Sequence, residues 1–471
     1  MGALVGVFTK QSNDAGGLTE EMLGSLCHRG NQRRIVTLQG NSGYSTGIGY
    51  CAHHEVGLHI ADSAGHALAV EGSLFNGAKI KQAGYVLRKV KRRANPRRSL
   101  SDIISTPGVF SILYCQENRL YAFRDAVGFK PLFYGRNRRL VAFASERKAL
   151  WKLGLERLQR VQPGRLYAVN PKGISKRTSV HLSRMPSDRA LTMEHAASHL
   201  ETLLRRSMQR AMSGQEKVAV AFSGGLDSSL TAVLAKEIGL QVELVAVGLL
   251  NSAELSSAES FAKQLGLPIK VEPYNLDSLE GYVRRIVWLI EEPELMKVSV
   301  AIPLHWAAEV AARLGHRILL CGQGSDELYG GYYKYSKTLD NQGRKALESE
   351  LYRSVVQSHI VNYERDDQAT APFGVELCSP FIDLDLIRFS LTIPSELKVK
   401  PGNDVMRKWI LRTVAQNLGV PSEIAWRRKK AIQHGTGVEQ AILKLAKGKT
   451  QSPEEYLRRI QAEVIDINSM P

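Results

Sequence analysis

The 471-residue sequence lacks long hydrophobic runs. No segment approaches twenty consecutive apolar residues, the length that a membrane-spanning helix requires. The first residues, 1–8, also lack the basic start, long apolar stretch and small-residue cleavage site of a secretory signal. Gly6 stands where a myristoylation motif carries Ser or Thr. We therefore expect a cytoplasmic protein without a membrane-spanning segment.

Cysteine is scarce, and the pairs with CxxC spacing that typify many zinc sites are absent. An odd, scattered set disfavours both a disulfide framework and a zinc site. We expect reduced and mostly buried thiols. The five cysteines are Cys27, Cys51, Cys115, Cys321 and Cys378.

Acidic residues are fewer than basic ones: the chain has 46 Asp and Glu residues and 63 Lys and Arg residues, which gives a formal net charge of +17. Seven of the cations lie between residues 88 and 98, around Asn95-Pro96. This stretch is interpreted as a solvated loop, and the alternative of an acidic partner such as nucleic acid stays open. No zinc finger or RNA-binding motif accompanies it. The seven are Arg88, Lys89, Lys91, Arg92, Arg93, Arg97 and Arg98.

The length favours two domains, and the pattern of the chain changes near residue 175. Before it, short strands are separated by Gly and Asn, which is typical of a mostly antiparallel β domain with a few helices. A Ser- and Arg-rich linker is expected at 176–195. After it, strands expected at 217–222, 242–249, 268–272 and 317–321 alternate with helices at 195–212, 228–238, 256–266, 277–290 and 303–314. This alternation predicts a parallel sheet covered on both faces.

The segment Ser223-Gly-Gly-Leu-Asp-Ser-Ser229 follows the first strand of this alternation and opens a helix. Ligands of such sheets bind at the carboxyl ends of the strands, where the amides of a helix N-terminus favour anions. Gly224 and Gly225 let the backbone approach bound oxygens, and the serines add hydroxyl donors. Asp227 would repel a bare phosphate, which suggests an intervening Mg²⁺. The other common phosphate loop, GxxxxGK[ST], is absent.

The segment resembles the SGGxDS loop of the ATP pyrophosphatase superfamily, whose members cut ATP between its α and β phosphates. Further blocks resemble asparagine synthetase in particular, in the same order along the chain. They are residues 322–333 (GQGSDELYGGYY), 374–376 (GVE) with 379–383 (SPFID), 408–412 (KWILR), 426–430 (WRRKK) and 435–437 (GTG).

The resemblance implies roles for residues of the C-terminal half, proposed as residues 190–471. Asp227 and Asp326 would hold Mg²⁺ against the pyrophosphate of ATP, and Lys429 would neutralise charge on the departing pyrophosphate. Glu291, from its spacing to Pro303, would assist amine attack as a base. Glu294 would contact the substrate amino group. The loop residues Ser223, Gly224, Gly225, Leu226, Asp227, Ser228 and Ser229 would wrap the pyrophosphate. Further nucleotide contacts would come from Val247, Gly248, Leu249, Gly322, Gln323, Gly324 and Ser325, and substrate contacts from Asp326 and Glu327.

The N-terminal part, residues 1–184, resembles the glutaminase domain of the same family. The blocks that carry this likeness are residues 28–30 (HRG), 124–135 (RDAVGFKPLFYG) and 144–150 (ASERKAL). The implied fold is an Ntn-hydrolase-like α+β domain of class II glutamine amidotransferases. It would be followed by a doubly wound, HUP-like ATP pyrophosphatase domain.

The residues of the glutaminase chemistry are missing from this scaffold. The family's nucleophile is a cysteine after the initiator methionine, where Gly2 stands here. Glu71 replaces the asparagine that steadies the oxyanion, and Gly57 replaces the arginine that binds the glutamine carboxylate. The usual HRGPD continues as Asn31-Gln32. We therefore expect no glutamine hydrolysis, with nitrogen coming from ammonia, a separate glutaminase or an internal amine.

Three functions remain open from the sequence. The first is an ammonia-dependent asparagine synthetase that converts aspartate, ATP and ammonia into asparagine, AMP and pyrophosphate. The second is another amide- or lactam-forming ligase, such as a β-lactam-synthetase-like or RNA-modifying enzyme. The third is a non-catalytic binding or regulatory protein, which the retention of Asp227, Asp326 and Lys429 disfavours. The acceptor and the oligomeric state, including a homodimer, are left open.

Overall fold

The computed structural model describes residues 2–10, 14–40, 43–54, 60–63, 65–75, 82–92, 95–116, 118–402, 404–429, 431–449 and 452–465. The chain divides into two compact units. The first contains Met1–His181 with Ala371–Gly374 and Ala462–Pro471, and the second contains Leu182–Thr370 and Val375–Gln461. Three residues used in the sequence analysis lie outside the described residues, namely Gly57, Arg93 and Lys430.

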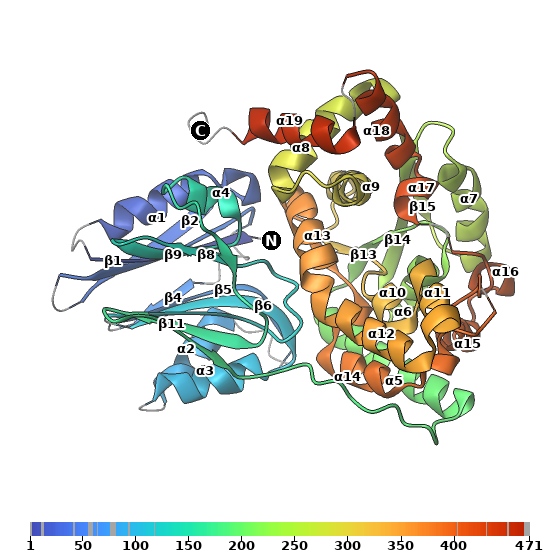
Figure 1. Ribbon diagram of the computed structural model, residues 1–471, viewed down its shortest axis with the longest axis horizontal. Coiled ribbons are helices and arrows are strands. Elements are labelled where there is room, and N and C mark those ends of the chain that lie inside the picture. Colours follow the sequence, from blue (N-terminus) through green and yellow to red (C-terminus); the bar gives the residue numbers. More distant parts are fainter. Residues whose placement is uncertain are drawn as a thin grey trace. The chain divides into compact units, whose positions relative to one another are not determined.

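The first unit contains two six-stranded antiparallel sheets that face each other (Figure 1). One sheet has the order β10-β8-β9-β1-β3-β2 and the other β12-β11-β7-β6-β5-β4. The strands of the first sheet are β1 (Gly2–Thr9), β2 (Gln32–Gln39), β3 (Ser45–Ala52), β8 (Phe133–Arg136), β9 (Leu140–Ala144) and β10 (Gln159–Arg160). Those of the second are β4 (Ile60–Ser63), β5 (His66–Leu74), β6 (Gly108–Gln116), β7 (Arg119–Arg124), β11 (Arg165–Asn170) and β12 (Gly173–Thr178).

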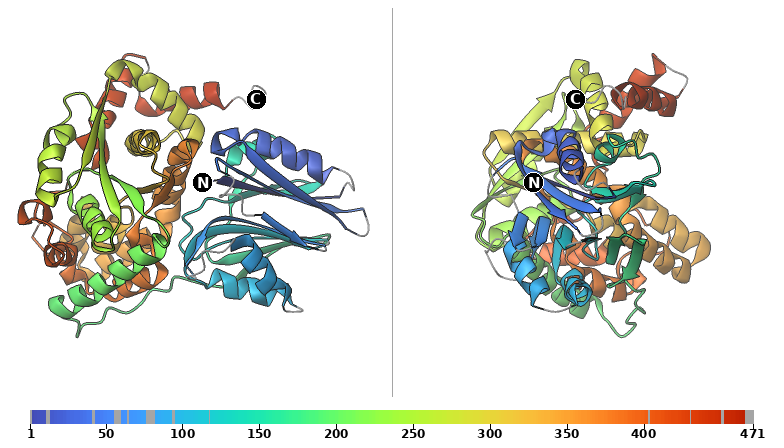
Figure 2. Two further views of the ribbon diagram at one scale, coloured as in Figure 1. Left: turned by 180° about the vertical axis from the view of Figure 1, so that it is seen from behind. Right: turned by 90° about the vertical axis from the view of Figure 1, so that its left-hand side faces the viewer.

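Helices cover the outer face of each sheet, so this unit is built in four layers (Figures 1 and 2). Helices α1 (Ala15–Gly24) and α4 (Arg147–Trp151) pack on the first sheet. Helices α2 (Gln82–Lys91) and α3 (Pro96–Ile104) pack on the second. All eight residues of β1 are buried, because both faces of this strand are covered. The antiparallel α+β architecture expected for the N-terminal part is confirmed.

The second unit is built around a five-stranded parallel sheet with the order β15-β14-β13-β16-β17. The order runs in opposite directions from β13, so the topological switch point lies between β13 and β16. In such sheets a crevice opens there at the carboxyl ends of the strands. The strands are β13 (Lys217–Ala221), β14 (Gln241–Leu249), β15 (Ile269–Tyr274), β16 (Ile318–Leu320) and β17 (Glu376–Cys378).

Helices α6 (Leu226–Glu237) and α9 (Leu295–Arg313) both contact β13 and β14, as expected for a doubly wound sheet covered on its two faces. Further helices surround this layer: α5 (Met193–Ala211), α7 (Ala253–Leu265), α8 (Leu279–Ile290), α10 (Ser325–Tyr329), α11 (Tyr333–Gln342), α12 (Arg344–Ser358), α13 (Glu364–Thr370), α14 (Leu384–Thr392), α15 (Trp409–Asn417), α16 (Ser422–Ala425), α17 (Ile432–Gly435), α18 (Val438–Lys447) and α19 (Pro453–Val464).

Helix α9 differs from the sequence prediction, because it begins at Leu295 and carries Pro303 inside it, whereas a helix was expected only from 303. Within the described part of the chain it is also the helix long and apolar enough to cross a membrane. However, 72% of its apolar window is buried, as in the core helix of a folded domain (Figure 1). Its composition is therefore explained by packing inside the second unit.

The predicted linker at 176–195 is too wide at both ends. Strand β12 continues to Thr178, and α5 begins at Met193, where the Thr192 side chain accepts a hydrogen bond from the His195 amide. The start of α5, which Thr192 caps, was thus included in the predicted linker because the first turn of this helix is polar.

Candidate active site

The loop between β13 and α6 lies at the switch point and has the form expected of an anion-binding turn. Gly224 adopts a left-handed conformation with φ of 63°, and a Cβ there would lie 2.6 Å from the Phe261 ring. The Ser223 and Ser228 hydroxyl oxygens lie 3.2 Å apart, and the Ser223 hydroxyl accepts from the Gly225 amide at 3.3 Å. Gly225 is the N-cap residue of α6 and provides no side-chain cap. The first turn of the helix can therefore present its amides to a bound anion.

Two carboxylates from different crossovers meet beside this loop. Asp227 belongs to the first turn of α6, after β13, and Asp326 belongs to α10, after the parallel neighbour β16. Gly322, in the loop after β16, permits this approach, because a Cβ there would lie 2.6 Å from the Cβ of Asp227. Both side chains are largely buried, with 22% of Asp227 and 17% of Asp326 exposed.

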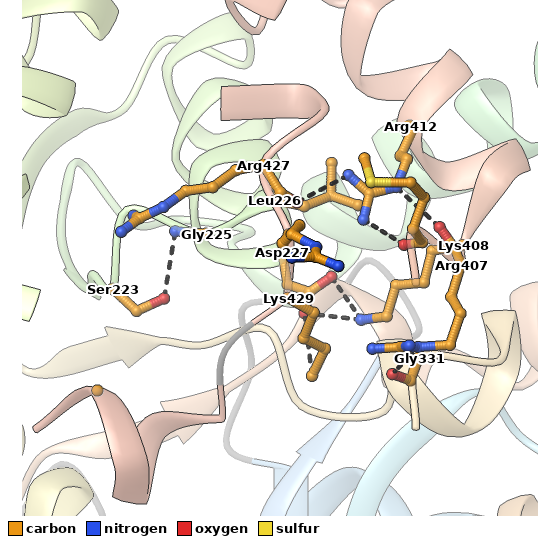
Figure 3. Close-up of a pocket in the computed structure, with 13 residues that line it drawn as sticks. Ser223, Gly225, Leu226, Asp227, Gly331, Arg407, Lys408, Arg412, Arg427 and Lys429 are labelled. Carbon is orange, nitrogen blue, oxygen red and sulfur yellow. Dashed lines mark hydrogen bonds and ion pairs between the residues drawn. The ribbon is translucent and has the colours of Figure 1, made fainter. Parts of the chain in front are cut away.

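A lysine ammonium lies between the two carboxylates, and its contact with Asp227 is drawn in Figure 3. Lys408 Nζ donates to both carboxylate oxygens of Asp227 at 2.7 Å and lies 2.6 Å from Asp326 Oδ1. The same ammonium donates to the Ser325 hydroxyl at 2.9 Å. Lys429 pairs with Asp326 Oδ2 and lies 4.0 Å from Asp227 Oδ2. The four residues form one compact charge cluster, which we call the Asp227–Asp326 cluster.

The electrostatics of this cluster keep Asp326 ionised. Burial alone would raise the pKa of Asp326, but the ammonium groups of Lys408 and Lys429 outweigh it and hold that pKa well below its usual range. Burial alone would lower the pKa of Lys429, but Asp326 and Asp227 raise it. The pair is therefore charged over the whole physiological range.

Lys408 was noted in the sequence only as part of a family block and was not predicted as a site residue. Its place depends on the loop before α15, where Arg407 and Lys408 both have left-handed backbones, with φ of 47° and 54°. Asp404 holds this loop by accepting from the amides of Met406 and Arg407 at 2.9 and 3.0 Å. A strained backbone at a charged pocket is typical of a functional position.

Six of the thirteen residues that line the pocket beside this cluster are cations (Figure 3). Among the described residues that line the pocket, six are basic and one, Asp227, is acidic. Arg427 donates to the Gly224 carbonyl at 3.1 Å, which ties a basic residue to the anion-binding turn. A lining with this many positive charges suits a polyanion such as a nucleoside triphosphate. The six are Arg407, Lys408, Arg412, Arg427, Arg428 and Lys429.

Arg412, one of these six residues, also hydrogen-bonds to the backbone of two neighbouring segments. Its guanidinium donates to the carbonyls of Arg407 at 2.7 Å, Ala425 at 2.6 Å and Arg427 at 3.1 Å. Burial lowers the pKa of Arg412 to about 10, so it stays protonated at neutral pH. It therefore joins the loop of Lys408 to the basic block at 426–430.

The end of β14, residues Val247, Gly248 and Leu249, lies on the far side of β13 from β16. The Leu249 amide donates to the Thr436 carbonyl at 3.0 Å, and Gly435 lines the pocket. A Cβ at Gly248 would lie 2.5 Å from the Ser252 hydroxyl. The late GTG block therefore meets the end of β14 next to the pocket, although the two are almost 190 positions apart in the sequence.

The block Gly322, Gln323, Gly324 and Ser325 forms the turn from β16 into α10. The Gln323 carbonyl accepts from the Ser379 hydroxyl at 2.7 Å, and Ser325 contacts Lys408 as described. Glu327 is turned into a buried group, where it accepts from the Tyr332 hydroxyl at 2.5 Å and from Asn362 Nδ2 at 2.7 Å. Burial and the nearby charge of Asp326 raise the pKa of Glu327.

The two remaining predicted residues lie in different environments. Glu291 ends α8 with a left-handed backbone and is 3% exposed. Its carboxylate accepts from Gln368 Nε2 of α13 at 3.3 Å. Glu294 is 58% exposed and lies 3.2 Å from the Lys297 ammonium. The structure thus holds Glu291 firmly and leaves Glu294 at the surface of this unit.

In the first unit, the position expected for a glutaminase nucleophile is closed. A Cβ at Gly2 would lie 2.3 Å from the Cys51 carbonyl oxygen and 2.5 Å from the Tyr50 hydroxyl. Such distances do not occur for real side chains, and the carbonyl belongs to the neighbouring strand β3, which pairs with β1. No nucleophilic side chain fits at this position without a shift of the backbone.

The neighbouring polar residues form a buried ion network. Arg29 lies 3.3 Å from Glu71 and also pairs with Glu146. Glu71 accepts from the Ser145 hydroxyl at 2.9 Å, and Lys148 pairs with Glu146. Because two cations offset two carboxylates, the network is balanced without a ligand.

Comparisons with known proteins identify the family of this chain. The family model described as Asparagine synthase matches residues 199–345 and 339–461, and the model described as Glutamine amidotransferase domain matches residues 100–152. A putative glutamine-hydrolysing asparagine synthetase of Methanocaldococcus jannaschii is 35% identical over 72% of this chain and 70% of its own length. Asparagine synthetase B of Escherichia coli is 26% identical over 79% of this chain and 70% of its own length.

Among solved structures, the glutamine phosphoribosylpyrophosphate amidotransferase of B. subtilis covers 57% of this chain and 65% of its own, at 17% identity and a TM-score of 0.34. The family assignment depends on the sequence relatives and on the matched family model, which covers more than half of the chain. This chain belongs to the asparagine synthetase family, whose members are ATP-dependent, amide-forming ligases.

Proposed function

We propose that this protein is an AMP-forming amide ligase that adenylates the side-chain carboxylate of aspartate and transfers it to ammonia. One observation carries the proposal: Asp227 and Asp326 converge at the switch point of the parallel sheet, beneath a pocket lined by six cations. The basic side chains would pair with the negative charges of a triphosphate, and the two aspartates would bind its metal ion.

The Asp227–Asp326 cluster fits a divalent cation. The two carboxylates already grip one cationic group, the Lys408 ammonium, from both sides. Carboxylate oxygens are the ligands that Mg²⁺ prefers in proteins, usually together with substrate phosphates. Asp227 and Asp326 would hold the metal, which would neutralise charge on the pyrophosphate of ATP.

The chain's own residues would bind and orient ATP as follows. The turn Ser223–Ser229 would wrap the β- and γ-phosphates, and Lys429 would stabilise negative charge as pyrophosphate departs. Val247, Gly248 and Leu249 would contact the adenosine, beside the turn of Gly435. An acceptor carboxylate oxygen would then attack the α-phosphorus and release pyrophosphate. Gln323 and Gly324 would line the path to the acceptor.

The second half of the reaction is amide formation. Ammonia attacks the acyl-adenylate carbon, AMP leaves with the bonding electron pair, and the surplus proton of the nitrogen passes to a base. We assign this role to Glu291, which Gln368 orients. The site has to exclude water, because a mixed anhydride hydrolyses. Glu294 and Glu327 are proposed to help select the acceptor's amino group.

The nitrogen is proposed to be free ammonia. Two observations support this proposal: a Cβ at Gly2 would lie 2.3 Å from the Cys51 carbonyl oxygen, and Glu71, which stands where an oxyanion-steadying asparagine is expected, pairs with Arg29 and accepts from Ser145. Ammonia would come from solution or from a separate glutaminase. Because the reaction consumes ATP, we expect the protein to act in the cytoplasm.

Pyrophosphate release tests the proposal. Purified protein is incubated with Mg-ATP, ammonium and single amino acids, and pyrophosphate is measured with a coupled enzyme assay. Aspartate-dependent release supports the proposal, and release with a different acceptor identifies another amide or lactam ligase. No release with any acceptor contradicts the ligase assignment. Glutamine in place of ammonium is expected to support no reaction.

A further inference from the structure

We propose that Lys408 occupies the metal position of the nucleotide-free protein, so that a divalent cation enters the Asp227–Asp326 cluster only when a nucleotide gives this ammonium another anionic partner. The inference rests on the proposed function, since it assumes that the cluster binds a metal. It adds a role for Lys408 as a positioning residue that couples metal binding to nucleotide binding.

Ammonium groups already contact the carboxylate oxygens that a metal would use. All four carboxylate oxygens touch an ammonium: Lys408 contacts both oxygens of Asp227 and one of Asp326, and Lys429 contacts the other. A metal bound by both aspartates therefore has to displace Lys408 from the oxygens that it would use. The side chain of Lys408 is 3% exposed, so water does not screen this competition.

The backbone around Lys408 carries the second step. Two consecutive non-glycine residues, Arg407 and Lys408, have left-handed conformations, which side-chain-bearing residues rarely adopt. Asp404 enforces them through its bonds to the loop amides. Gly331 leaves the space for the lysine, because a Cβ there would lie 2.2 Å from Lys408 Cε and 1.8 Å from Asp326 Oδ1. The fold thus places this ammonium between the carboxylates at a cost in strain.

The pocket carries the third step. Lys408 lines this pocket together with four arginines and Lys429, so an incoming polyphosphate would lie within reach of the lysine. Once phosphate oxygens accept its hydrogen bonds, the aspartates can take a divalent cation. Coupling between two ligands is reciprocal, so the metal would strengthen nucleotide binding by the same factor.

The experiment measures metal affinity, without turnover. Free Mn²⁺ is quantified by electron paramagnetic resonance during titration of the full chain, with and without α,β-methylene-ATP, which is not cleaved between its α and β phosphates. Wild type is compared with Lys408→Met, with Lys408→Gln as a second variant. Lys345→Met, at an exposed position of α12, is the matched control. Thermal unfolding confirms that each variant is folded.

Without nucleotide, we expect Lys408→Met and Lys408→Gln to bind Mn²⁺ at least about tenfold more tightly than wild type, because a competing positive charge is gone. Lys345→Met should match wild type. The increase in Mn²⁺ affinity caused by α,β-methylene-ATP should shrink in both Lys408 variants. A change of less than about threefold in nucleotide-free Mn²⁺ affinity, for a folded variant, overturns the inference. This readout is independent of pyrophosphate release, so failure of the ligase proposal is detected separately.

Discussion

At the scale of single residues, charge decides what the site can do. Asp227 and Asp326 come from neighbouring crossovers, and Lys408 and Lys429 hold the pKa of Asp326 well below its usual range. Asp227, Asp326, Lys429 and the turn at 223–229 were predicted from the sequence as parts of one site, and the structure brings them together. The contact of Lys408 with Asp227 could not be predicted, because 181 positions separate the two residues and only the folded loop before α15 brings them together.

Replacing Asp227 by Asn removes one carboxylate of the proposed metal site. We expect aspartate-dependent pyrophosphate release to fall on the order of a hundredfold or more, since the charge on the leaving group would lose its counter-ion. Asp277→Asn, an exposed substitution just before α8, serves as the control and should keep wild-type rates. Retention of more than a tenth of the rate by Asp227→Asn would exclude an essential role for this carboxylate.

Lys429→Met tests the second ammonium. It should reduce kcat by about a hundredfold to a thousandfold, because an ammonium that stabilises developing charge on pyrophosphate acts mainly in the transition state. KM for ATP should change less than kcat. Steady-state pyrophosphate assays at varied ATP separate the two parameters, and an effect confined to KM would place Lys429 in ground-state binding only.

At the scale of secondary-structure elements, helix α9 was predicted only from residue 303 onward, for an identifiable reason. Helix α9 continues through Pro303, a residue that normally marks a helix boundary. By contrast, four of the five strands of the parallel sheet were predicted to within two residues at each end, and three of them (β13, β14 and β16) read as mainly apolar runs. The three-residue strand β17 was not predicted.

Asp366 in helix α13 is expected to make the stability of the protein depend on pH. Burial raises the pKa of Asp366 from 3.8 to about 6, although Arg365 donates to it at 2.7 Å. A carboxyl whose pKa is raised by folding binds more protons in the folded state, so the free energy of unfolding should fall as the pH rises from about 4 to about 6. Asp366→Asn should flatten this dependence.

Urea unfolding of wild type and Asp366→Asn between pH 4 and pH 7 provides the measurement, with Asp277→Asn as the control. The stability difference between wild type and Asp366→Asn should shift in favour of the variant across this interval. An unchanged difference at every pH would show that Asp366 does not titrate there.

At the scale of the whole molecule, the two units differ in what they retain. The second unit has a charged cluster open to a pocket, whereas the first has a closed and internally neutralised network around Arg29 and Glu71. The sequence indicated the missing cysteine, but only the structure shows that Tyr50 and the Cys51 carbonyl close the position next to Gly2. Loss of glutaminase activity would therefore not be reversed by one substitution.

Gly2→Cys tests this conclusion. We expect no glutamate release from glutamine and a loss of stability of about 1–3 kcal/mol from overpacking against β3. Gly24→Cys is the matched control, because no atom lies within 4 Å of a Cβ at Gly24. Glutaminase assays and thermal unfolding provide the two readouts. Recovery of glutamine hydrolysis in a stable Gly2→Cys variant would show that the site is intact apart from its nucleophile.

The central claim, adenylation of aspartate followed by capture of ammonia, is tested most directly by the nucleotide product. ATP labelled at the α-phosphate is incubated with the protein, aspartate and ammonium, and the nucleotides are separated and counted against asparagine formed. We predict one AMP for each asparagine and no ADP. Stoichiometric ADP with inorganic phosphate would contradict the account.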